Sequence, residues 1–209
     1  DHQPAAEGQF AGVGLLQSGQ DAEKSRFSRA IAAHQADAVA LVQSQRGVVT
    51  LHRPGNVDDP GTMAQICAAL KEISCELPLI FPVHPRTQGN LEKFGIELGS
   101  KITLVGPQAY MPFLNLWKDA AVVLTDSGGL QEETTAMGVP CITIRNNTER
   151  PVTVEQGSNV LAGTDPVSII AETRKVLRGE GKQGRRPHLW DGKAAERIVA
   201  VLAAELAGQ

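Results

Sequence analysis

Short apolar runs alternate with helix-like segments along most of this chain. The runs at 47–51 and 121–124 have the length and β-branched content of buried strands, and similar runs recur at 78–83, 102–105, 140–144 and 159–162. The clearest helical spacing follows Asp59 and Pro60, a favourable pair for starting a helix. Continuous apolar strands that alternate with helices predict an α/β fold, a Rossmann-like doubly wound parallel sheet of about six strands.

The stretch 125–139, TDSGGLQEETTAMGV, follows one of these runs and predicts a strand, a glycine turn and a helix. Gly128 and Gly129 allow a ligand to approach the backbone closely. The first turn of a helix offers unpaired N–H groups and the positive end of the helix dipole, which suit a phosphate. Glu132 and Glu133 lie within one turn of this anion site and could accept hydrogen bonds from sugar hydroxyls. A tight turn that only packs a helix on the sheet fits the motif equally well.

Polar residues recur directly after the expected strands. In a parallel sheet these strand ends share one edge, where ligands bind. Two histidines, several arginines and a glycine turn at one edge favour an anionic, polyhydroxylated ligand, and a nucleotide sugar fits that description. The clusters are His52 with Arg53, His84 with Arg86, Gln108, Asp126 with Ser127, and 145–150.

Composition and charge narrow the function further. The chain has 209 residues and a net charge of −3, which gives no basic footprint for nucleic acid or an anionic membrane surface. No apolar run approaches the length of a membrane span. The three cysteines, Cys67, Cys75 and Cys141, show no disulfide framework, so we expect reduced, buried thiols in a cytoplasmic protein.

Several chemistries are disfavoured by the motifs. His52 and His84 have no third ligand nearby in sequence, so no metal site is predicted. Ser127 lies in DSGG rather than GxSxG, which argues against a serine hydrolase. The turn also lacks the GK[ST] of a P-loop.

Five segments, VVTLHRPGNVDD, FPVHPRT, LTDSGGLQEE, RNNTERPVTVEQGSNVLAG and WDGKAAERI, closely resemble motifs of the non-hydrolysing UDP-N-acetylglucosamine 2-epimerases in order and spacing. The resemblance covers about 47–206. It implies one half, the C-terminal domain, of a GT-B fold, which has two Rossmann-like domains facing a cleft. The assignment is therefore a loose lead-in over residues 1–20 and one UDP-binding domain over 21–209, with a helix over 21–45.

The resemblance also implies residue roles. His52 would be the catalytic residue facing the phosphates and the sugar, and His84 with Arg86 would line a regulatory UDP-GlcNAc site. The expected UDP-binding residues are Ser127, Gly128 and Gly129 for the diphosphate, Glu133 for the ribose, Gln108 and Phe113 for the uracil, and Arg150 for the phosphates and sugar.

Family members interconvert UDP-GlcNAc and UDP-ManNAc by eliminating UDP and adding it back, without a cofactor. The carboxylates that act at C2 belong to their N-terminal domain, which 209 residues do not accommodate beside the C-terminal one. We therefore expect an isomerase domain that binds UDP or UDP-GlcNAc and is inactive without its N-terminal partner. A stand-alone UDP-sugar binding module, a hydrolysing epimerase, a glycosyltransferase of the same architecture and a homodimer remain open alternatives.

Overall fold

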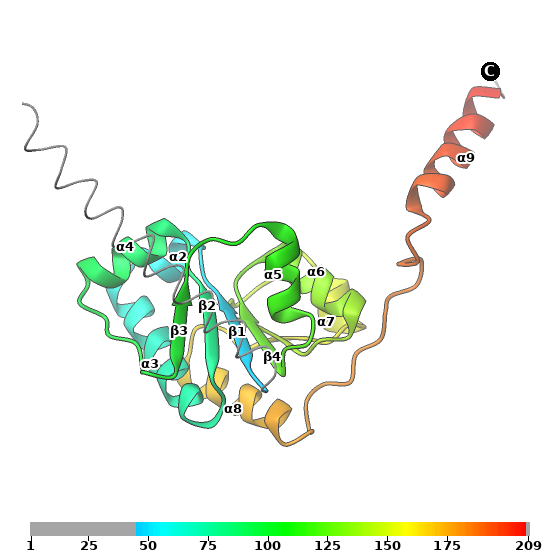
Figure 1. Cartoon of the computed structure of the whole chain (residues 1–209). Helices are drawn as coiled ribbons and strands as arrows, with labels where there is room; N and C mark the ends of the chain where they lie inside the picture. Colours follow the sequence, from blue (N-terminus) through cyan, green and yellow to red (C-terminus); the bar gives the residue numbers. More distant parts are fainter. Residues whose placement is uncertain (1–44, 208–209) are drawn as a thin grey trace, which may run out of the picture.

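The computed structural model describes residues 45–207 of the chain. The expected lead-in at 1–20 and nearly all of the helix expected over 21–45 lie outside the described residues. Helix and strand labels below follow Figure 1.

One six-stranded sheet forms the centre of the domain (Figure 1). Its strands lie in the order β3-β2-β1-β4-β5-β6, and each neighbouring pair is parallel. This is the predicted Rossmann-like topology, with the strand order characteristic of doubly wound sheets. The strands are β1 (Gly47–Thr50), β2 (Leu79–Pro82), β3 (Ile102–Val105), β4 (Val122–Thr125), β5 (Cys141–Thr143) and β6 (Asn159–Leu161).

Helices cover both faces of the sheet. Val49 and its alternating neighbours pack under α3 (Pro60–Glu76) and α8 (Pro166–Leu177). Val48 and its neighbours pack on the opposite face, under α5 (Tyr110–Trp117) and α6 (Gly128–Met137). Because successive strand residues point to opposite faces, the continuous apolar runs in the sequence fill two cores.

Three further helices occupy connections. α4 (Pro85–Lys93) follows β2, as expected, whereas α2 (Pro54–Val57) and α7 (Pro151–Glu155) are short helices in segments expected to be loops. Both begin with proline at the first helical position, where the missing N–H costs nothing. Asp59 caps α3 by accepting a hydrogen bond from the backbone N–H of Thr62 at 2.7 Å.

The cysteines are free, but they do not share one environment. Cys67 and Cys141 are buried, as expected, and the expectation was wrong for Cys75, which is exposed. Cys67 lies on the buried face of α3, together with Met63, Ile66 and Leu70, whereas Cys75 lies one residue before the helix end on its solvent side.

The last helix, α9 (Ala194–Ala207), lies apart from the sheet and carries no buried residue (Figure 1). It nevertheless presents large exposed apolar side chains, namely Ile198, Val199, Val201, Leu202 and Leu206. Over residues 45–207, the structure contains no helix with the length and apolar character needed to cross a bilayer.

Candidate functional site

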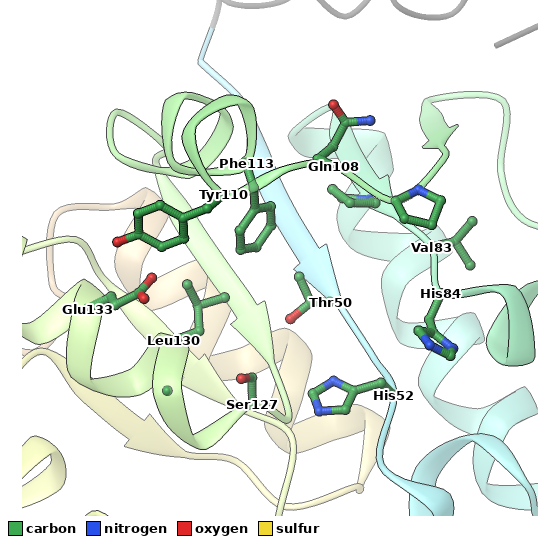
Figure 2. A pocket seen from close by; sticks show the side chains of 13 residues that line it. Thr50, His52, Val83, His84, Gln108, Tyr110, Phe113, Ser127, Leu130 and Glu133 are labelled. Carbon is green, nitrogen blue, oxygen red and sulfur yellow. The ribbon is translucent and has the colours of Figure 1, made fainter.

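A pocket lies where the strand order reverses, at the carboxyl ends of β1 and β4. After β1 the chain builds outward to β2 and β3, and then returns to place β4 on the other side of β1. Ligands of doubly wound sheets bind at this switch point. The pocket has a volume of about 330 Å³ and is lined by Thr50, His52, Pro82, Val83, His84, Pro107, Gln108, Tyr110, Phe113, Ser127, Gly129, Leu130 and Glu133 (Figure 2).

The start of α6 forms one wall of this pocket. The hydroxyl of Thr125 accepts a hydrogen bond from the Ser127 N–H at 3.0 Å, and it lies 2.6 Å from the Thr50 hydroxyl across the β1–β4 pair. Ser127 occupies the N-cap position, but its side chain makes no capping bond. A Cβ placed on Gly129 would meet no atom within 4 Å. The helix therefore begins beside open space. Because the Ser127 side chain accepts no hydrogen bond from the first turn, the N–H groups of that turn are available to another acceptor.

The buried carboxylate of Asp126 fixes the loop that follows β1. Its side-chain oxygens accept hydrogen bonds from the backbone N–H groups of His52, at 3.1 Å, and Arg53, at 2.9 Å. The side-chain amide of Asn56 donates to Asp126 at 3.1 Å and to the Ile144 carbonyl at 2.9 Å. Because Asp126 is fully buried, these donors replace the water that would otherwise solvate its charge.

Asp126 also orients the imidazole of His52. Nδ1 of His52 lies 3.1 Å from Oδ1 of Asp126, so Nδ1 carries the proton and Nε2 is left as the second functional nitrogen. The hydrogen bond to Asp126 raises the pKa of His52 above its usual value, against the opposing effect of partial burial. A half-exposed histidine of this kind can hold a proton at Nε2 and offer it to an anion, or release it.

The opposite side of the pocket combines apolar surface with polar groups. Tyr110 and Phe113 come from the start of α5, and Figure 2 shows their rings beside the space that Leu130 borders from α6. Gln108 donates a hydrogen bond from Nε2 to the Gly106 carbonyl at 2.8 Å. Partial burial, aided by the charge of Glu132, raises the pKa of Glu133. An apolar wall beside a few polar groups suits a flat base attached to a sugar.

The two residues predicted for a regulatory site are placed differently. His84 lines the pocket, and its Nδ1 accepts a hydrogen bond from the Arg86 backbone N–H at 3.2 Å. The Arg86 side chain instead pairs with Asp58, with Nε donating to Oδ1 at 2.9 Å. The structure thus places His84 in the pocket and Arg86 outside its lining.

Two of the residues expected to bind UDP also lie outside the pocket lining. Nε of Arg150 lies 3.1 Å from the Glu132 carboxylate, and both side chains are partly exposed. Gly128 faces an ion pair, since a Cβ there would lie 3.8 Å from the Glu149 carboxyl carbon and 3.9 Å from Arg53 Nη2. The pocket therefore brings together His52, Gln108, Phe113, Ser127, Gly129 and Glu133, with His84 at its edge.

Sequence reasoning placed Asp126 among the polar residues at the strand ends but assigned it no role. The sequence did contain a signal for such a role. An acidic residue directly after a buried strand is often buried itself, and a buried carboxylate needs hydrogen-bond donors. Thr50, Tyr110 and Leu130 were also missed as pocket residues, since apolar and hydroxyl side chains carry no distinctive signal. Across residues 45–207, no group of three His, Cys, Asp or Glu side chains is placed to hold a metal ion.

A parallel sheet in this order, with an open helix start and a polar pocket at its switch point, defines a Rossmann-like α/β domain of the kind that forms half of a GT-B fold. The sequence profile of the UDP-N-acetylglucosamine 2-epimerases matches residues 16–203. The chain belongs to this family, which confirms the resemblance seen in its motifs.

The similarity extends to named relatives and to solved structures. The UDP-N-acetylglucosamine 2-epimerase of Methanococcus maripaludis is 39% identical over 164 residues, which span 76% of this chain and 44% of that protein. The Pseudomonas aeruginosa UDP-2,3-diacetamido-2,3-dideoxy-D-glucuronate 2-epimerase is 38% identical, over 77% of this chain and 45% of that protein.

Among solved structures, the Methanocaldococcus jannaschii UDP-GlcNAc 2-epimerase in complex with UDP-GlcNAc and UDP matches with a TM-score of 0.71 and 36% identity. That match covers 82% of this chain and 48% of the other. The chain therefore spans somewhat less than half of the length of these relatives.

Proposed function

We propose that this chain forms the C-terminal, nucleotide-binding half of a UDP-N-acetylglucosamine 2-epimerase. The observation that carries the proposal is the meeting of His52 and the open start of α6 in one pocket at the switch point of the sheet. The solved structure of a relative in complex with UDP-GlcNAc and UDP supports UDP as the nucleotide that this pocket would bind.

Each part of UDP has a counterpart in the pocket. The uracil would lie against Phe113 beside Gln108, and the ribose hydroxyls would donate to Glu133. The diphosphate would take the N–H groups at the start of α6, around Ser127 and Gly129. Arg150 would approach the phosphates and sugar from its place beside Glu132, a movement of its side chain away from that pair.

The reaction would invert C2 of the sugar through loss and return of UDP. Departure of UDP leaves negative charge on the diphosphate, and N–H groups and a cation fixed in advance stabilise such charge. His52 supplies that cation when Nε2 is protonated, and the raised pKa favours this state. The acid and base acting at C2 would belong to the N-terminal half of the enzyme.

A calorimetric titration with UDP tests the site. We expect saturable binding that Gly129→Ala weakens at least about tenfold, equivalent to about 1.4 kcal/mol, since the added methyl group occupies space that the diphosphate needs. Gly89→Ala is the matched control, because Gly89 is also helical, also has open space at its Cβ position and lies outside the pocket lining. Equal UDP affinity in both variants would contradict the proposed diphosphate position.

Catalysis is tested by supplying the N-terminal half of a family member in trans. Formation of UDP-ManNAc from UDP-GlcNAc, followed by NMR, would support an epimerase half, whereas free ManNAc would indicate a hydrolysing enzyme and sugar transfer a glycosyltransferase. UDP binding without turnover, whichever N-terminal half is supplied, would indicate a binding module. UDP-2,3-diacetamido-2,3-dideoxy-D-glucuronate is the second candidate substrate, favoured by a relative of nearly equal identity, so both sugars belong in the assay.

A further inference from the structure

A carboxylate from the segment after β5 is held between two arginines at the start of α6. Oε1 of Glu149 accepts a hydrogen bond from Arg53 Nη2 at 2.6 Å, and Oε2 lies 2.7 Å from Arg145 Nη1. Arg145 is the more enclosed cation, with only 15% of its side chain exposed, and the Nη1 contact lacks the alignment of a hydrogen bond. The arginines come from different strand ends, so the carboxylate is what joins them.

This ion cluster lies against the helix start. The Glu149 carboxyl carbon and Arg53 Nη2 are the groups that a Cβ on Gly128 would approach, at 3.8 and 3.9 Å. The first turn of α6 contains no acidic residue of its own, and Ser127 provides no side-chain cap. The positive end of α6 and two guanidinium groups thus converge on one carboxylate, as they would on a bound anion.

Glu149 remains charged in this setting. A hydrogen bond from its own backbone, together with Arg53 and Arg145, lowers the pKa of Glu149 to about 2. The backbone around it is anchored, since the Thr148 hydroxyl donates to buried Gln131 at 2.6 Å and accepts from the Arg150 N–H at 2.9 Å. The Glu149 side chain itself is 44% exposed. A change of its rotamer would therefore release both arginines from Glu149 without moving the loop, while Arg53 Nε still donates to the Asp126 carbonyl at 3.3 Å and Arg145 Nη2 to Asn147 Oδ1 at 3.1 Å.

We propose that Glu149 is an internal counter-ion of the diphosphate site, which holds Arg53 and Arg145 at the start of α6 until the phosphates of the nucleotide displace it. The inference rests on the proposed UDP site. A carboxylate and a diphosphate are both negatively charged and repel each other at close range, so the two would compete for the same cations. The competition lowers the apparent affinity for any ligand that carries the phosphates, and leaves its nucleoside part unaffected.

Calorimetry of the Glu149→Gln variant tests the proposal. Glutamine keeps the shape and can still accept from Arg53, but it removes the competing charge. Because the pairs are partly exposed, we expect UDP to bind about three- to tenfold more tightly than to the unchanged chain, with uridine affinity the same in both. Glu180→Gln is the control, since it removes the same charge and breaks an exposed pair with Arg178.

The outcomes separate the two proposals. Tighter binding of UDP but not of uridine by Glu149→Gln, absent in Glu180→Gln, supports the internal counter-ion. UDP binding that is unchanged or weaker overturns it and leaves the proposed function standing. Binding of neither UDP nor uridine by any of the three proteins overturns both. A urea unfolding curve for each variant confirms that the affinities refer to folded protein.

Discussion

Replacement of Asp126 by alanine should be among the most destabilising single changes in the described part of the chain. The substitution removes the acceptor of the His52 and Arg53 backbone N–H groups and of the Asn56 side-chain amide, all at 2.9–3.1 Å. A buried donor that loses its partner costs roughly 1–3 kcal/mol, and since water can reach part of this loop we expect a total of about 3–5 kcal/mol.

Urea unfolding measures this loss directly. With a slope of about 2 kcal/mol per molar urea, typical of small domains, the midpoint should fall by about 1.5–2.5 M. Asp59→Ala provides the comparison, because Asp59 is an exposed helix cap with one short bond to the Thr62 N–H. Loss of such a cap costs about 1 kcal/mol, or about 0.5 M. A midpoint shift in Asp126→Ala no larger than in Asp59→Ala would refute the assignment of Asp126 as the residue that holds this loop.

Three further predictions concern individual residues. The pKa of His52, followed by NMR, should fall in the Asp126→Asn variant, because the hydrogen bond to Asp126 is what raises it. In the unchanged protein the raised pKa of His52 contributes stability at acid pH, and this contribution is lost as the pH rises through that pKa. The same pH-dependent loss of stability should be absent in the variant. Gly157→Ala should destabilise the fold by about 1–3 kcal/mol in the same urea assay, because a Cβ would lie 2.6 Å from the Thr153 carbonyl oxygen, and an unchanged midpoint would contradict this. In native protein a thiol reagent should modify exposed Cys75 alone among the three cysteines, since burial raises the pKa of the other two thiols to about 11, and fast reaction of all three before unfolding would be the contrary result.

The sheet was predictable from the sequence because its strands are buried on both faces. Runs such as that ending at Leu124 are apolar at every position, and a short run of β-branched residues with this pattern is typical of a strand that faces two cores. The short helices α2 and α7 were not predicted, since four or five residues contain too little periodicity to separate them from loops. Their proline starts were the only local signal.

Much of the pocket was predictable from one rule, that side chains following parallel strands meet at one edge. This rule and the family resemblance together brought His52, Gln108 and Ser127 to the same place. The rule predicts where the backbone of a residue lies, but not which way a long side chain points. Arg86 and Arg150 point toward Asp58 and Glu132, partners that only the folded arrangement supplies.

The pairing of β1 with β4 has a consequence for how the domain folds. Thr50 and Thr125, whose hydroxyls meet across this pair, are 75 residues apart in the chain, whereas Val123 and Cys141 of the β4–β5 pair are separated by 141 − 123 = 18. Closing the longer loop loses more chain entropy before any contact compensates it. The pocket residues that follow β1 and those that follow β4 therefore come together only when this pairing, the most distant in sequence, has formed. During synthesis, a ribosome must release the whole of β4 before the pocket can exist, so capture of the proposed nucleotide would report that β1 and β4 have paired rather than assist the steps before that pairing.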